Sequence, residues 1–162
     1  MQPGASQTED RLVLLSMIDG LGACTKEQLM RFSLEAQLMA QFRFLLAVGD
    51  LTEEGLAREA DLPEGRVLVL TPEGREALRL FGDTLRPSVQ ERLKENVPHW
   101  RRRFMDERQL PAEWREEAGG YRVVLRALEQ GQELLRIELP AVTRQQAQRF
   151  CRRWPENAGA LY

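Results

Sequence analysis

The sequence has 162 residues, 43% of them hydrophobic and 30% charged, which is typical of a globular protein with one domain or two small ones. It contains no apolar run of about 18 residues, no signal-peptide pattern at its start and only two, widely separated cysteines, so membrane spans, secretion and a disulfide framework are not expected. The net charge of −2 divides unevenly, because residues 1–84 carry 8 Lys/Arg against 14 Asp/Glu and residues 85–162 carry 15 against 11.

The first part of the chain predicts three helices. Thr8 is a candidate N-cap for a helix over about residues 9–19, and the capping box Thr25–Gln28 begins a second helix. The third helix, over about residues 36–54, has an apolar stripe at positions i, i+3, i+4 and i+7. The stripe consists of Phe44, Ala47, Val48 and Leu51. Gly49 weakens this helix by about 1 kcal/mol relative to alanine, so tertiary packing must hold it.

A β-hairpin and a fourth helix follow. Two short predicted strands, over about residues 56–60 and 66–70, flank the turn sequence DLPEG and indicate the hairpin. Thr71 and Pro72 then supply an N-cap and a first helical residue directly after the second strand. The buried face of the fourth helix is expected to consist of Ala77, Leu78 and Phe81.

The remaining chain predicts helix, three strands and helix. A helix begins near Pro87, and Pro98 is expected to break or kink it. The stretches AEWREE, YRVVLRALE and ELLRIEL predict strands, and Pro111 indicates that the first of them lies at a sheet edge. Thr143–Gln146 predicts a second capping box for the last helix, which Pro155 is expected to end. This helix is expected to pack through Ala147, Phe150, Cys151 and Trp154.

This order of elements predicts the fold class. Three helices, a hairpin and a further helix are typical of a winged helix-turn-helix, in which the third helix enters the major groove and the hairpin, or wing, contacts the DNA backbone or the minor groove. We therefore expect an α+β protein with an N-terminal winged helix-turn-helix and a C-terminal βββα module that contains a three-stranded antiparallel sheet. The predicted domains are residues 8–84 for the winged helix-turn-helix, 85–107 for linker helices and 108–162 for the C-terminal module.

Several stretches also resemble known families. LVLTPEGREAL is similar to the wing-to-helix segment of winged-helix repressors such as the PadR group. Over about residues 10–155 the chain more closely resembles the uncharacterised bacterial winged-helix family DUF4364, through LVLLSMIDGLGACTKEQLMRF, LTEEGLAREADLPEGRVLVLTPEG and the tail GGYRVVLRALEQGQELLRIELPAVTRQQAQRFCRRW. The resemblance implies a winged-helix fold and a role in transcription regulation, and it carries no established activity.

Polar residues on the predicted winged helix are candidates for DNA contact. Glutamine and arginine on the third helix have the side chains that read adenine and guanine, and the cations of the second helix and the wing suit phosphate contacts. The candidate residues are Lys26, Arg31, Gln37, Gln41, Arg43, Arg58 and Arg66. These residues predict a cytoplasmic DNA-binding transcription regulator, whose C-terminal module serves dimerisation or effector sensing.

A second hypothesis follows from the acidic residues of the wing. Glu59, Asp61 and Glu64 would repel phosphate, and this favours a winged-helix adaptor that binds protein without DNA. No enzyme activity, metal or cofactor is predicted, because His99 is the only histidine and no phosphate-binding loop is present. The expected partners are DNA and a second copy of the chain, with an unidentified small-molecule effector as a further candidate and no membrane.

Overall fold

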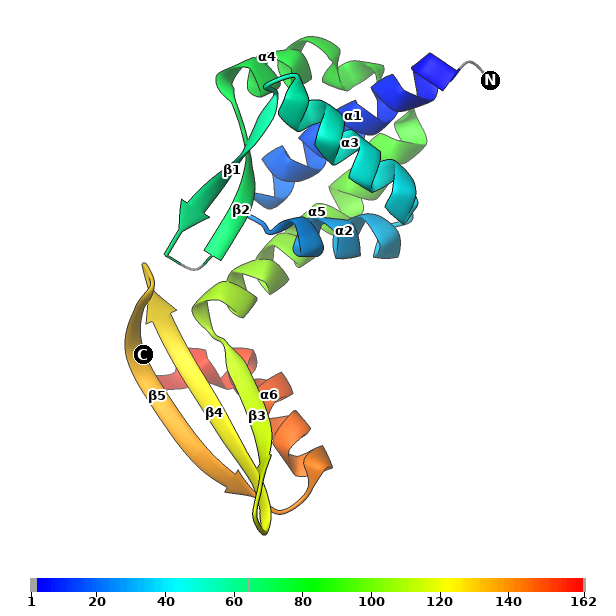
Figure 1. Cartoon of the computed structure of the whole chain (residues 1–162). Helices are drawn as coiled ribbons and strands as arrows, with labels where there is room; N and C mark the ends of the chain where they lie inside the picture. Colours follow the sequence, from blue (N-terminus) through cyan, green and yellow to red (C-terminus); the bar gives the residue numbers. More distant parts are fainter. Residues whose placement is uncertain (1–2, 64, 162) are drawn as a thin grey trace. The chain divides into compact units, whose positions relative to one another are not determined.

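The computed structural model describes residues 3–63 and 65–161, and the chain divides within one helix into a unit that ends at residue 102 and a unit that starts at residue 103 (Figure 1). The N-terminal unit contains a two-stranded antiparallel sheet and the C-terminal unit a three-stranded one. The protein is therefore α+β, as its sequence predicts.

Helices dominate the N-terminal unit. Its elements are α1 (Pro3–Leu21), α2 (Lys26–Glu35), α3 (Gln41–Glu53), β1 (Ala57–Leu62), β2 (Gly65–Leu70), α4 (Pro72–Phe81), the short 3₁₀ helix η1 (Gly82–Thr84) and the first part of α5 (Pro87–Gln109). Helix α1 packs against α3 and α4 (Figure 1). The predicted stripe of α3 is buried, as are Leu14 and Met17 of α1 and Leu29 and Phe32 of α2, and both of these helices contact α3.

Of the N-caps predicted for the first two helices, only the second is confirmed. The N-cap prediction at Thr8 is wrong, since α1 begins at Pro3 and Thr8 lies inside it. The acidic residues after Thr8 instead form ion pairs with distant arginines. The capping box of α2 is confirmed: Thr25 Oγ1 accepts from the backbone amide of Gln28 at 3.1 Å, and Gln28 Oε1 accepts from the amide of Thr25 at 3.0 Å.

The junction between β2 and α4 is fixed by Thr71 and Gly74. Thr71 Oγ1 accepts from the backbone amide of Gly74 at 3.1 Å and donates to the carbonyl oxygen of Gly55 at 2.6 Å. A Cβ on Gly74 would lie 1.9 Å from the carbonyl oxygen of Leu56, so only glycine fits there. The N-cap prediction is confirmed, but the burial predicted for Phe81 is wrong, because its side chain is 54% exposed.

Helix α5 continues through Pro98, so the predicted break at this proline is wrong. The residues on either side of the proline contact α1. Val97 lies against Gly20, and Arg101 Nε donates to the carbonyl oxygen of Gly20 at 2.6 Å. Proline has no backbone N–H and removes one helical hydrogen bond, and these contacts with α1 help to offset that loss.

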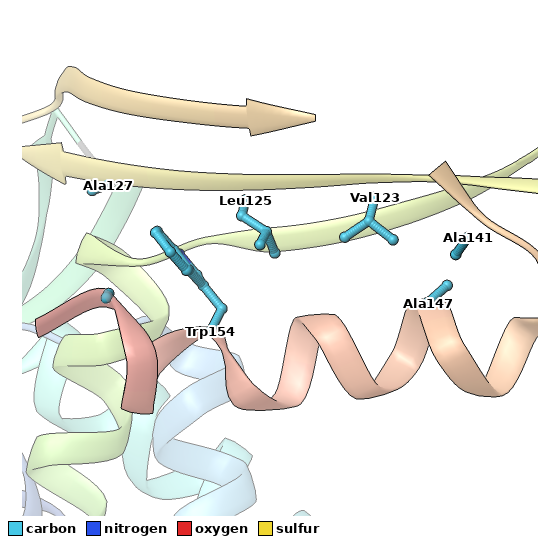
Figure 2. Close-up of a cluster of buried hydrophobic side chains, with 7 residues drawn as sticks. Val123, Leu125, Ala127, Ala141, Ala147 and Trp154 are labelled. Atoms are coloured by element: carbon cyan, nitrogen blue, oxygen red, sulfur yellow. The ribbon is translucent and has the colours of Figure 1, made fainter. Parts of the chain in front are cut away.

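The C-terminal unit is a sheet covered on one face by a helix. It consists of the end of α5, β3 (Ala112–Glu117), β4 (Gly120–Glu129), β5 (Gln132–Ala141), α6 (Arg144–Ala158) and the 3₁₀ helix η2 (Gly159–Leu161), with strand order β3–β4–β5. The edge position predicted from Pro111 is confirmed for β3. Alternate residues of β4 pack against α6, and Trp154 Nε1 donates to the carbonyl oxygen of Arg126 at 2.8 Å. Figure 2 shows this cluster, which includes Val123, Leu125, Ala127, Ala141 and Ala147.

The predictions for the two ends of α6 are confirmed only in part. Thr143 caps the helix, but Gln146 Oε1 accepts from the amide of Val142 at 2.8 Å, so the second capping box is incomplete. Pro155 lies inside α6 rather than at its end. Ala158, which follows the proline within the helix, is buried in the same hydrophobic cluster, and this packing stabilises the last turn of α6.

Candidate functional site

The turn between α2 and α3 is held by backbone contacts. Gln37 has φ 54°, a left-handed conformation, and its carbonyl oxygen accepts from Arg92 Nη1 of α5 at 2.7 Å. Ser33 Oγ, fully buried, donates to the carbonyl oxygen of Met39 at 3.3 Å. The turn therefore presents the exposed Gln37 side chain beside the start of α3, where Gln41 is also exposed.

Arg43 is directed toward α1. Its guanidinium group contacts both carboxylate oxygens of Asp10, with an Nε–Oδ2 distance of 2.9 Å, and Nη2 also donates to Ser6 Oγ at 3.3 Å. The Asp10 residue is 6% exposed, and its hydrogen bonds raise the pKa of Arg43 above the usual value. Arg43 thus compensates a buried charge within the unit.

Cations of the hairpin and of the start of α2 surround Glu59. Lys26 contacts one carboxylate oxygen of Glu59, and Arg66 Nη1 lies 3.6 Å from the other. Arg66 Nε also contacts Asp61 at 3.0 Å, and Arg58 Nη1 donates to the carbonyl oxygen of Glu59 at 3.5 Å. The hydrogen bond with Lys26 lowers the pKa of Glu59, which therefore stays charged to lower pH.

The remaining candidates are dispersed. The guanidinium carbon of Arg31 lies 5.9 Å from the ring centroid of Trp100, so Arg31 covers part of the core. The structure thus brings Lys26, Arg58 and Arg66 together and directs Arg43 elsewhere. Glu64, the third acidic residue of the predicted wing, lies outside the described residues.

The outward face of α3 (Phe42, Leu45, Leu46 and Gly49) is a feature that sequence analysis missed. Phe42 is 72% exposed, Leu45 53% and Leu46 45%, opposite the buried stripe. A hollow of about 230 Å³ lies between this face and α1, and its lining on α3 combines Phe42, Leu46 and Ala47 with the charged Arg43 and Asp50. The signal was present in the sequence, because α3 has a second apolar stripe with the same helical spacing as the first.

The C-terminal unit contains a separate hollow of about 550 Å³ beside α6. Its lining combines apolar residues such as Leu110 and Pro111 with Arg103, Arg152 and the Cys151 thiol. Burial, and secondarily the charge of Glu113, raise the pKa of Cys151, so this thiol is mostly protonated near neutral pH. A hollow of this volume is large enough for a small molecule.

Comparisons with known proteins give one result. The model of a family described as a domain of unknown function, DUF4364, matches residues 10–162. No curated protein and no solved structure matches the chain. Within residues 3–63 and 65–161, none of the helices combines the length and apolar character needed to cross a membrane.

Proposed function

The chain belongs to the DUF4364 family, a domain of unknown function, and from this premise we propose that its N-terminal unit is a winged helix-turn-helix that binds a protein through the outward face of α3. The element order supports the winged-helix assignment. Three helices precede the β1–β2 hairpin, α4 follows it, and an antiparallel bridge joins Cys24, between α1 and α2, to Leu68 of β2.

The observation that carries the proposal is the composition of the outward face of α3. In a winged helix this is the surface that meets a partner, and here it is apolar. Phe42, Leu45 and Leu46 together expose the equivalent of about 1.7 large side chains, whose burial is worth about 3–5 kcal/mol. Contiguous exposed apolar side chains of this kind are typical of protein interfaces.

The ion pairs of the candidate cations also favour a protein partner over DNA. Affinity for DNA depends mainly on cations that neutralise phosphates. Lys26 and Arg66 already contact Glu59, and Arg43 contacts Asp10. The acidic side chains next to these cations oppose the approach of a phosphate backbone.

DNA binding is the second candidate function. It is favoured by Arg58 and Arg66 on the hairpin, both exposed, and by Gln41 at the start of α3. Exposed ion pairs such as Arg66–Asp61 are weak and exchange readily for a phosphate contact. In this function the C-terminal unit would provide the dimer contact or bind an effector in its hollow of about 550 Å³.

Site-specific photo-crosslinking tests the proposal. A photoreactive amino acid replaces Leu45, and the matched control replaces Leu80, a leucine of α4 with a similar exposed fraction of 55%. We expect a polypeptide adduct from position 45 that is absent from position 80. Fluorescence anisotropy with genomic DNA fragments over a salt series runs in parallel. Sequence-selective, salt-dependent DNA binding without an adduct at position 45 would instead establish the second candidate.

A further inference from the structure

Gly49 has no intramolecular reason to be glycine. It lies inside α3, where glycine is less favourable than alanine, and it is exposed. Apart from the adjacent residues and the backbone of its own helix, a Cβ built on Gly49 would have no described atom within 4 Å, whereas the same atom on Gly74 would collide with the backbone of Leu56. A glycine in an open helical surface suits the close approach of another backbone or a large side chain.

The outward face of α3 is complementary to a second copy of itself in the antiparallel direction. Phe42, Leu45, Leu46 and Gly49 follow one another at i, i+3, i+4 and i+7. Two antiparallel α3 helices related by a two-fold axis between Leu45 and Leu46 would set Phe42 of each against Gly49 of the other. The largest side chain then faces the position without a side chain, and the two central leucines meet.

The charges at the two ends of α3 also favour an antiparallel pair of these helices. The first turn of α3 contains no acidic residue, whereas Glu53 and Asp50, which also lies 3.4 Å from Arg11 Nε of α1, are near its C-terminal end, where the helix dipole disfavours negative charge. In the antiparallel arrangement the positive N-terminal end of the second α3 lies beside these carboxylates.

From this self-complementarity, and resting on the proposed function of the outward face of α3, we propose that its partner is a second copy of this chain, bound as an antiparallel α3–α3 dimer. The contact is isologous and closes on itself, so it produces a dimer rather than a chain of molecules. It covers the surface that would read the major groove, which makes the dimer a form that does not bind DNA through α3.

Sedimentation velocity on the full-length protein measures the association. We expect a concentration-dependent dimer that Leu45→Glu abolishes and that the matched control Leu80→Glu leaves unchanged. Gly49→Ala is expected to weaken dimerisation at least tenfold while raising the thermal unfolding midpoint of the dilute monomer. These opposite effects distinguish an interface role from misfolding. A wild-type protein that stays monomeric at high concentration, or a Gly49→Ala protein that dimerises as well as wild type, overturns the proposal.

Disulfide trapping tests the register. In a background with Cys24→Ser and Cys151→Ser, a Phe42→Cys protein is mixed with a Gly49→Cys protein and oxidised. We expect the mixed disulfide to exceed twice the amount of either homodisulfide, the ratio that random pairing gives, because the two Cα atoms must approach within about 7 Å. A random distribution of the three products, or an excess of either homodisulfide, contradicts this dimer. A monomeric wild type that still crosslinks at position 45 to a different protein would refute the second copy and leave the proposed function intact.

Discussion

Arg43→Ala is expected to destabilise the N-terminal unit by about 3 kcal/mol, near the lower limit for removing one partner of a buried ion pair. The magnitude follows from the unequal burial of the pair. The Asp10 side chain is 9% exposed and would lose its charge partner, whereas the Arg43 side chain is 43% exposed, so water can partly replace it. The variant therefore leaves a nearly buried carboxylate with only part of its compensation.

The assay is urea denaturation followed by circular dichroism, with a second substitution as the diagnostic. Adding Asp10→Ala to Arg43→Ala removes the orphaned carboxylate and is expected to recover about 1–2 kcal/mol. Arg79→Ala is the control, because Arg79 forms an exposed ion pair with Glu76 whose loss should not change stability measurably. If Arg43→Ala is as stable as wild type, or if the double variant is less stable than the single one, this account of the pair is refuted.

Gly74→Ala should destabilise the protein by about 3 kcal/mol or more, because its Cβ would meet the carbonyl oxygen of Leu56 at 1.9 Å; a variant with an unchanged melting temperature would contradict this contact. In a Cys24→Ser background, the alkylation rate of Cys151 should rise with pH at a midpoint above that of a free cysteine, because burial and Glu113 raise the thiol pKa. Glu113→Gln should lower that midpoint, and no change on this substitution would remove the carboxylate from the explanation.

Local signals in the sequence predicted the elements well. The N-caps at Thr25 and Thr71 are confirmed because each bonds a backbone amide only three residues ahead. The helix breaks predicted at Pro98 and Pro155 are wrong, because contacts with residues distant in the sequence stabilise both helices. Helix α5 crosses Pro98 while its neighbours contact α1, and α6 crosses Pro155 while Ala158 reaches the core. A proline weakens a helix locally, and packing that the sequence does not display can outweigh this cost.

The candidate site could be predicted only in part for the same reason. The polar candidate residues and the acidic character of the hairpin are visible in the sequence, and so is the second apolar stripe that includes Phe42 and Leu45. The partner of each charge is not visible. Asp10 and Arg43 are 33 residues apart, as are Lys26 and Glu59, and neither pairing follows from a local pattern.

The sequence by itself thus determined the order of helices and strands, the α+β class and the buried stripe of α3, because caps, turns and helical spacing act over a few residues. Only the tertiary structure decided that Arg43 compensates Asp10 within the unit and that Phe42 remains outside the core. Those outcomes depend on which elements meet in space, since the free energy of a charge or an apolar side chain is set by its surroundings rather than by its neighbours in the chain.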